Sequence, residues 1–419
     1  MELPLFSSQK FNLIVVGGGA AGFMAAITAS EAGCKSVLLL EGNPNPLEKV
    51  RISGGGRCNV THACWDPKDL SFNYPRGQKN LLNSFRRFAS GDSVAWFAER
   101  GVDLITESDG RMFPSSNSSS EIIDCLRKRA TLSGVILKTS SQVKKIKHLN
   151  ANEFIISCRD GTSFFSRTVL LATGSNPSGR KIASELGHQI VTPIPSLFSF
   201  QLSSDKITSC SGLAIDNVDL NLITSQNSFH QRGRILITHW GLSGPAILRL
   251  SSFAARNLFH DKYKAVVQID WVEFNSNEIK NLFEKYRNNN GNKSLSAVKP
   301  FSNIPKRLWY LLLEKAKVSP SIRWAELTKL DKRNLIDVLK KSNYFLKGRG
   351  PFRDEFVTAG GIDLSEVDFL TMESRKIKGL FFAGEVLDID GLTGGFNFQH
   401  CWTSGWIAGL AISSLYSKS

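Results

Sequence analysis

The chain has 419 residues, of which 42% are hydrophobic and 21% are charged. These values are typical of globular proteins, and they exclude disordered, collagen-like and small disulfide-rich chains. Lys and Arg outnumber Asp and Glu by 52 to 37, a net charge of +15, and the length predicts two or three domains at roughly 100–200 residues each.

Seven scattered cysteines include no C-x-x-C pair, so a disulfide framework or a zinc site is not expected. This pattern favours a reducing, cytoplasmic compartment. The N-terminus lacks the features of a signal peptide. The most apolar window, 11–29, is long enough to span a membrane, but four glycines divide it into a strand and a helix. We therefore expect a soluble protein without a membrane segment.

The first motif of the chain is a strand over 11–16 that runs into Gly-Gly-Gly-Ala-Ala-Gly. A helix to about residue 32, a second apolar strand over 36–40 and Glu41 follow. Gly17 permits a tight turn, Gly19 lets the backbone approach a pyrophosphate, and Gly22 lets helix and strand pack closely. Glu41 is placed to accept hydrogen bonds from a ribose. The order predicts dinucleotide binding, with FAD or NAD(H) favoured over a 2′-phosphorylated nucleotide.

A second glycine-rich loop, Ser-Gly-Gly-Gly-Arg-Cys-Asn, spans 53–59. Its glycines can present a row of N–H donors to an anion, and Arg57 adds a charge. The other interpretation is a flexible surface loop. The position directly after the nucleotide-binding unit favours the first interpretation.

The central part of the chain is rich in strand patterns. Alternating residues over 134–166 predict a strand meander in which Val143 packs near an adenine, and a strand over 168–171 enters the Ala172-Thr173-Gly174 turn. From 193 to about 268 the pattern is again β-rich, and it contains the glycine-rich segment 238–245.

The C-terminal part repeats the first motif in outline. A strand enters a turn at Gly384 and Glu385, a glycine turn covers 391–398, and a helix of small residues is predicted over 404–413. No second complete G-x-G-x-x-G unit occurs, so a separate NAD(P)H domain is not predicted. We expect a single nucleotide-binding domain with an insertion, which holds one cofactor from both chain ends.

The positive charge is concentrated between 276 and 350, where 17 Lys and Arg face 6 Asp and Glu, a net +11. Amphipathic runs over 302–317, 323–329 and 332–341 predict a small helical subdomain. The charge is either a solvated surface or a polyanion-binding face, and composition does not decide between them. Six aromatic residues lie among these charges: Phe301, Trp309, Tyr310, Trp324, Tyr344 and Phe345. Such rings can stack on unpaired bases, but we expect most of them to belong to the core.

These motifs together resemble the BaiN/RdsA family of NAD(P)/FAD-dependent oxidoreductases, which includes proteins called aminoacetone oxidases. The residues that carry the resemblance are the glycine turn 15–22, the loop 53–59, the segment 238–245, Thr-Ala-Gly-Gly at 358–361, and 383–388 with 394–397. The resemblance implies an α/β fold, in which a glutathione-reductase-like FAD-binding Rossmann domain is interrupted by two subdomains. The expected bounds are 1–192 with 352–419 for the FAD domain, 193–275 with about 342–351 for a β-rich subdomain, and 276–341 for a basic helical subdomain.

The resemblance also implies cofactor-binding residues. The ADP half of FAD is expected to contact Gly17, Gly19, Ala21, Gly22, Glu41 and Val143. The pyrophosphate and flavin side is expected to contact Arg51, Gly56, Arg57, Cys58 and Asn59. Ala172, Thr173 and Gly174 are expected to pass beneath the cofactor. Glu385, next to Gly384, is expected at the ribityl or pyrophosphate region, and the isoalloxazine is expected beside Gly395, Asn397 and Phe398. One departure is a short turn over 175–180, where many members have a longer glycine-rich turn, so the local pocket wall differs.

Family members reduce a C=C bond conjugated to a carbonyl, in a ribosomal RNA uridine or in a bile-acid enone, and another is an amine oxidase. The resemblance therefore implies hydride from reduced flavin, electrons from NAD(P)H and an acid that protonates the substrate. The basic stretch favours ribosomal RNA over a small metabolite such as an enone or aminoacetone. A non-catalytic flavin-binding RNA partner is the alternative from another class. Cys58 and His239 are the candidate acids, each with a structural role as the alternative, and the same holds for His400.

Overall fold

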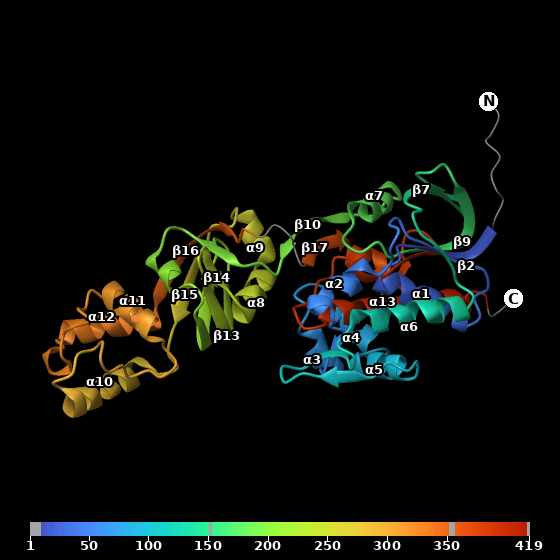
Figure 1. Ribbon diagram of the computed structural model, residues 1–419. Helices are drawn as coiled ribbons and strands as arrows, with labels where there is room; N and C mark the ends of the chain where they lie inside the picture. Colours follow the sequence, from blue (N-terminus) through green and yellow to red (C-terminus); the bar gives the residue numbers. More distant parts are fainter. Residues whose placement is uncertain (1–9, 151–152, 352–356, 417–419) are drawn as a thin grey trace. The chain divides into compact units, whose positions relative to one another are not determined.

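The computed structural model describes residues 10–150, 153–351 and 357–416. The chain forms two compact units, Met1–Pro193 with Val357–Ser419, and Ile194–Phe356 (Figure 1). Each unit is described by itself. The division of the second unit into a β-rich and a helical subdomain stays a proposal.

The first unit is built on a sheet of buried parallel strands. Its path runs β18-β19-β20-β9-β1-β2-β6, and β1 (Lys10–Val16) pairs in parallel with β2 (Val37–Leu40) and β9 (Ser163–Leu171). β6 (Ile136–Lys138) and β20 (Leu380–Phe382) extend the parallel part. The apolar window 11–29 is divided as predicted, since β1 is followed by helix α1 (Ala20–Glu31). Strand, glycine turn, helix and parallel strand form a Rossmann unit, which confirms the predicted α/β fold class.

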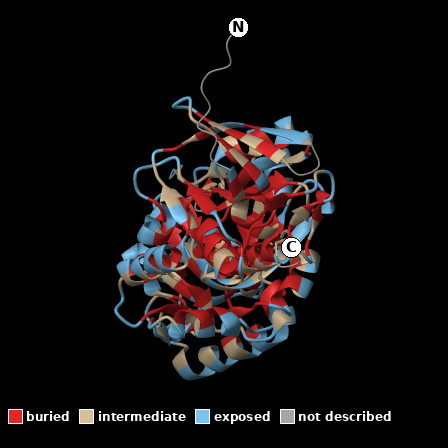
Figure 2. Cartoon of the chain, turned by 90° about the vertical axis from the view of Figure 1, so that its right-hand side faces the viewer, coloured by how far each residue is buried: buried red, intermediate tan, exposed pale blue. Residues whose placement is uncertain are grey.

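Helix α1 packs against the C-terminal helix α13 (Phe396–Ser414) and also contacts α6 (Ser119–Leu132) (Figure 1). A Cβ atom at Gly409 would lie only 2.7 Å from the Ala25 carbonyl oxygen, so small residues allow the two helices to approach closely. α1 is buried along most of its length. Figure 2 shows such buried segments in red on the inside, with exposed segments in pale blue around them. The two ends of the chain therefore meet in one core.

Helix α13 begins eight residues earlier than the sequence pattern predicts. Gly395 takes a φ of +93° and is its N-cap, so Asn397 and Phe398 belong to the first helical turn and not to a loop. The other elements of this unit are α2 (Glu48–Gly56), β3 (Thr61–His62), α3 (Pro67–Ser71), α4 (Gln78–Phe85), α5 (Ser90–Ala98), β4 (Leu104–Thr106), β5 (Arg111–Pro114), β7 (Val143–Asn150), β8 (Glu153–Cys158), α7 (Pro177–Glu185), β17 (Val357–Ile362), β18 (Val367–Asp368), β19 (Glu373–Ser374), and the 3₁₀ turns η3 (Leu364–Glu366) and η4 (Gly384–Val386). Strand β10 (Ile190–Ser196) pairs with β17.

The second unit contains a closed barrel with the strand order β11-β14-β13-β12-β15-β16. The strands are β11 (Phe200–Leu202), β12 (Ala214–Ile223), β13 (Ser228–Thr238), β14 (Gly241–Ser243), β15 (Val266–Asp270) and β16 (Ser342–Arg349). The same unit also contains the 3₁₀ helix η1 (Lys206–Cys210) and the helices α8 (Pro245–Phe253) and α9 (Ala255–His260).

Helices α10 (Ser276–Asn290), α11 (Lys306–Lys315) and α12 (Lys329–Lys340) lie between β15 and β16 in the chain. Their apolar side chains share one core with the barrel. The predicted helical run 323–329 is wrong: only the 3₁₀ turn η2 (Trp324–Glu326) forms, because Leu327 is extended and Thr328 caps α12. Of the six aromatics between 301 and 345, four are buried, whereas Tyr310 and Phe345 are exposed.

Across the described ranges, we find no helix with both the length and the apolar character needed to cross a membrane.

Candidate functional site

The first glycine turn joins β1 to α1 and leaves open space at the helix N-terminus. A Cβ at Gly17 (φ +113°) would lie 2.4 Å from the Ala172 carbonyl oxygen, and one at Gly22 would lie 2.0 Å from the Gly17 oxygen. Gly19 is the N-cap of α1, and no described heavy atom lies within 4 Å of the position its Cβ would take. The first N–H groups of α1 thus face a space that suits a phosphate.

Glu41 directly follows β2, beside this turn. Its carboxylate oxygens accept hydrogen bonds from the backbone N–H groups of Gly18 (2.7 Å) and Asn43 (2.7 Å). Each oxygen has a second lone pair, so the acid is held in place and can still accept from a ribose hydroxyl. The Ser141 N–H donates to the Glu41 carbonyl (2.8 Å), which brings the start of β7 and the buried Val143 to this side of the sheet.

The second glycine loop leaves the helical conformation at Ser53. Gly54, Gly55 and Gly56 have φ values of +58°, +70° and +88°, and Cys58 has +63°. No described heavy atom lies within 4 Å of a Cβ built at Gly55 or Gly56. Successive exposed glycines in this conformation present backbone donors to an anion, as the sequence pattern predicts.

Arg57 and Arg51 differ in how they are held. The Arg57 guanidinium pairs with Glu107 (2.7 Å) and lies 4.0 Å from the centre of the Phe113 ring. Arg51 is exposed and pairs with Glu48 at 3.5 Å. Their contact with the cofactor stays a prediction, and Arg57 has the more defined position.

The glycine turns from the two chain ends meet. With its amide oxygen facing α13, Asn59 accepts a hydrogen bond from the Gly395 N–H (2.9 Å) and donates to the Thr61 carbonyl (3.0 Å). A Cβ at Gly384 (φ +72°) would lie 2.9 Å from the Ala21 Cβ, so the turn after β20 packs on the start of α1. The loop 53–59, the first turn of α1 and the N-terminus of α13 therefore belong to one constellation.

Lys49 is a residue of this constellation that sequence reasoning missed. Its ammonium group donates to the Ser175 hydroxyl (2.8 Å) and forms an ion pair with Glu385. A Cβ at Gly174 would lie 3.6 Å from the Glu385 carboxylate, so the Ala172-Thr173-Gly174 turn borders the pair. Only its place one turn before the glycine loop could have indicated Lys49. The buried Thr173 hydroxyl has no hydrogen-bond partner among the described residues.

The polar side chains at the start of α13 hold the backbone around them. The Asn397 amide oxygen accepts from the Gly391 N–H (2.8 Å), and its amide nitrogen donates to the Gly391 carbonyl (2.9 Å). Gln399, which sequence reasoning also missed, accepts from Thr61 (2.6 Å) and Ser93 (2.9 Å). Phe398 stacks on Trp402 with ring centres 5.8 Å apart. This network fixes the N-terminus of α13, where its dipole favours a negative charge.

The structure bears differently on the three candidate acids. Cys58 is fully buried, and burial raises the pKa of its thiol to about 12, which makes it a weak acid and favours a structural role. His239 is exposed and lies in the second unit, in the turn between β13 and β14. Its ring is edge-on to the ring of Trp240, with ring centres 4.3 Å apart. His400 is 1% exposed, neither ring nitrogen has a hydrogen-bond partner within the described chain, and burial lowers its pKa to about 4.

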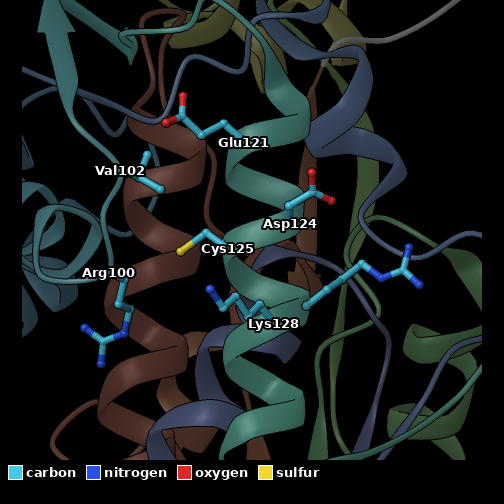
Figure 3. A pocket seen from close by; sticks show the side chains of 7 residues that line it. Arg100, Val102, Glu121, Asp124, Cys125 and Lys128 are labelled. Atoms are coloured by element: carbon cyan, nitrogen blue, oxygen red, sulfur yellow. The ribbon is translucent and has the colours of Figure 1, made fainter.

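A surface hollow of about 540 Å³ lies apart from these turns, along α6 and the segment after α5 (Figure 3). Arg100, Glu121, Asp124 and Lys128 line it around the Cys125 thiol. Burial raises the pKa of this thiol to about 11, so it is protonated and unreactive at neutral pH. Its mixed charges indicate no particular ligand.

The residues present fit FAD. Space is open above Gly19 and above Gly55 and Gly56, at two N–H-rich turns that suit phosphate oxygens. The carboxylate that would bind the ribose is held in place at Glu41.

Comparisons with known proteins bear on the family and the fold of this chain. The sequence model described as HI0933-like protein Rossmann domain matches residues 11–411. The chain is 29% identical over 413 residues to a ribosomal RNA dihydrouridine synthase of Escherichia coli, covering 95% of this chain and 97% of that protein. It is 28% identical over 412 residues to a 3-dehydro-bile acid delta(4,6)-reductase of Clostridium scindens, covering 95% and 98%.

Among solved structures, a 3-ketosteroid-delta4-(5alpha)-dehydrogenase from Rhodococcus jostii matches with a TM-score of 0.51 at 14% identity, covering 98% of both chains. A flavocytochrome c3 fumarate reductase matches with a TM-score of 0.50 at 18% identity, covering 97% of this chain and 78% of that one. At these identities the structural matches support the fold alone.

Proposed function

Because this chain belongs to the HI0933-like family of FAD-binding Rossmann proteins, we propose that it reduces the conjugated C=C bond of a uracil ring in ribosomal RNA. The family membership and the enzyme class predicted from the motifs are confirmed: the protein is an FAD-dependent oxidoreductase. The RNA substrate, and NAD(P)H as the electron donor, are the parts that we propose.

The observation that carries the RNA substrate is the charge of the second unit. All 17 Lys and Arg between 276 and 350 lie in the described part of the chain, and none is buried. A steroid-like substrate gains nothing from a net +11, whereas phosphate groups are attracted by it. The name of the E. coli relative is consistent with this substrate.

The residues of the first unit have defined tasks in this reaction. When bound and reduced by NAD(P)H, the flavin of FAD would supply the hydride that reduces the ring. The glycine turns at Gly19 and Gly56 bind its phosphates through backbone N–H groups, and Glu41 orients its ribose. The Lys49–Glu385 pair and the Asn59–Gly395 hydrogen bond hold the two chain ends around it. His239, which belongs to the second unit, is the exposed one among the candidate acids, and we retain it as the proposed proton donor to the substrate.

The decisive experiment maps dihydrouridine in ribosomal RNA from a strain in which the gene is deleted. We expect one dihydrouridine to disappear and to return when the wild-type gene is restored. An unchanged map rejects the RNA substrate. A purified protein that releases no FAD on denaturation contradicts the assignment as a flavoenzyme itself.

The alternative is a reductase or oxidase of a small metabolite, such as an enone or aminoacetone, and the bile acid reductase relative favours it. Two assays distinguish it: NAD(P)H consumption with a steroid enone, and oxygen consumption with aminoacetone. Turnover in either assay, together with an unchanged dihydrouridine map, replaces the RNA substrate with a small molecule.

A further inference from the structure

A groove in the second unit combines an exposed aromatic ring with positive charge. It has a volume of about 560 Å³ and lies between η1 and α11. This volume is within the range of about 300–1,000 Å³ found for small-molecule sites. Its lining residues are Ser209, Arg307, Tyr310, Leu311, Glu314, Lys317, Val318, Ser319 and Pro320.

Tyr310 is the residue that distinguishes this groove. Its neighbour Trp309 is fully buried in the core, whereas the Tyr310 side chain is 38% exposed and forms part of the wall. Leu311 and Pro320 add apolar surface beside the ring. A flat, partly exposed ring with apolar surroundings is a surface on which an unpaired nucleobase can stack.

Two cations line the same groove. Arg307 donates to the Ser211 carbonyl (2.6 Å), which fixes its guanidinium near η1, and Lys317 follows the end of α11. The groove also contains one carboxylate, Glu314, which forms an ion pair with Lys206. Positive charge in the same groove as an aromatic ring suits the phosphates that flank a stacked base.

We propose that this groove docks an unpaired segment of RNA, with a base stacked on Tyr310 and the flanking phosphates held by Arg307 and Lys317. The proposal rests on the proposed function, for which it specifies the docking surface. Single-stranded RNA is the occupant that the groove fits, because the bases of an RNA duplex are stacked and hidden from a side-chain ring.

The backbone offers a matched pair of variants for the test. Lys317 follows α11 with a φ of +58°, and the Val318 N–H closes the helix on the Leu313 carbonyl (3.0 Å). Lys262 follows α9 in the same way, with a φ of +52°. Glycine is the residue that this conformation favours, so Lys317→Gly and Lys262→Gly each remove one charge without backbone strain. Only Lys317 lines the groove.

The experiment measures binding of a fluorescently labelled oligouridylate to the full-length holoenzyme by anisotropy, over a series of salt concentrations. We expect Tyr310→Ala to weaken binding roughly tenfold and Tyr310→Phe to leave it unchanged. Lys317→Gly is expected to weaken binding a few-fold and to reduce the slope of log K against log salt by about 0.7. Lys262→Gly is expected to match the wild type.

Equal losses of affinity in Lys317→Gly and Lys262→Gly would indicate diffuse charge attraction and overturn the proposal that RNA docks in the groove. Unchanged binding by Tyr310→Ala overturns base stacking, and a wild-type protein that does not bind the oligonucleotide overturns the whole proposal. The dihydrouridine map of the deletion strain is independent of these results. Groove-dependent binding with an unchanged map therefore refutes the proposed reaction alone, and a changed map without groove-dependent binding refutes the docking surface alone.

Discussion

A Cβ atom at Gly405 in α13 would lie 2.6 Å from the carbonyl oxygen of Ala21 in the first turn of α1. This distance is below van der Waals contact, so only glycine allows the C-terminal helix to lie against the start of the nucleotide-binding helix. Because Gly19 and Gly384 both lie near the first turn of α1, we expect the packing of α1 on α13 also to affect the shape of the proposed FAD site.

Gly405→Ala is therefore expected to destabilise the protein by roughly 1–3 kcal/mol, the usual cost of overpacking, despite the better helix propensity of alanine. The measurement is urea unfolding of the purified protein. Gly91→Ala in α5 is the control, because no described heavy atom lies within 4 Å of its Cβ position and alanine there is not expected to destabilise. Equal stability of the two variants would contradict this account of the packing.

Gly19→Ala tests whether the space above α1 belongs to the cofactor. Gly19 has a φ of −92° and open space around its Cβ position, so the variant is expected to fold with wild-type stability in the absence of FAD. A methyl group there occupies the path of the pyrophosphate, and we expect FAD affinity to fall at least tenfold. Flavin absorbance of the purified variant and titration of the apoprotein with FAD measure this. Full retention of FAD would place the pyrophosphate elsewhere.

Cys58→Ala distinguishes a structural thiol from a catalytic acid. Since burial raises the Cys58 pKa to about 12, we expect kcat to stay within about twofold of wild type, because no proton transfer is lost. The smaller side chain leaves a cavity, so stability is expected to fall by roughly 1 kcal/mol. A loss in kcat of about 10²–10⁴-fold without loss of FAD would instead establish Cys58 as the acid.

His400 is expected to make stability depend on pH. Burial lowers its pKa from an ordinary value of 6.5 to about 4, so between these values the unfolded chain binds the proton that the folded chain excludes. The His400 contribution to the free energy of unfolding is therefore fully present above pH 6.5 and is lost as the pH falls toward 4. The total loss is about 3 kcal/mol, at 1.36 kcal/mol per pKa unit.

The measurement compares urea unfolding of wild type and His400→Asn between pH 7 and pH 4. Acidic residues that titrate in the same range affect both proteins and cancel in the difference. We expect the difference in unfolding free energy to shift in favour of the variant as the pH falls. A constant difference across this range shows that His400 is accessible to protons in the folded state.

Much of the local geometry of the proposed FAD site was predictable from local sequence. Gly17 and Gly56 occupy backbone conformations that side chains oppose, and Gly22 occupies a position without room for a Cβ, so each requirement is visible in a single residue type. Glu41 ends an apolar strand at the expected distance from the turn. The family resemblance and the basic stretch 276–350 also required only the order and composition of residues.

Other properties were decided by contacts between residues far apart in the chain. Lys49 meets Glu385 across 336 positions, and Gln399 meets Thr61 across 338, so no local pattern announces either pair. The start of α13 depends on Gly395, whose N–H is held by Asn59. For the same reason, residue type alone did not reveal that Trp309 is buried and Tyr310 exposed. The sequence by itself determined where the backbone must bend and which charge the chain carries, because these are local properties. Only the tertiary structure decided which side chains are buried, paired or exposed, because burial and pairing depend on what the rest of the fold packs against each residue.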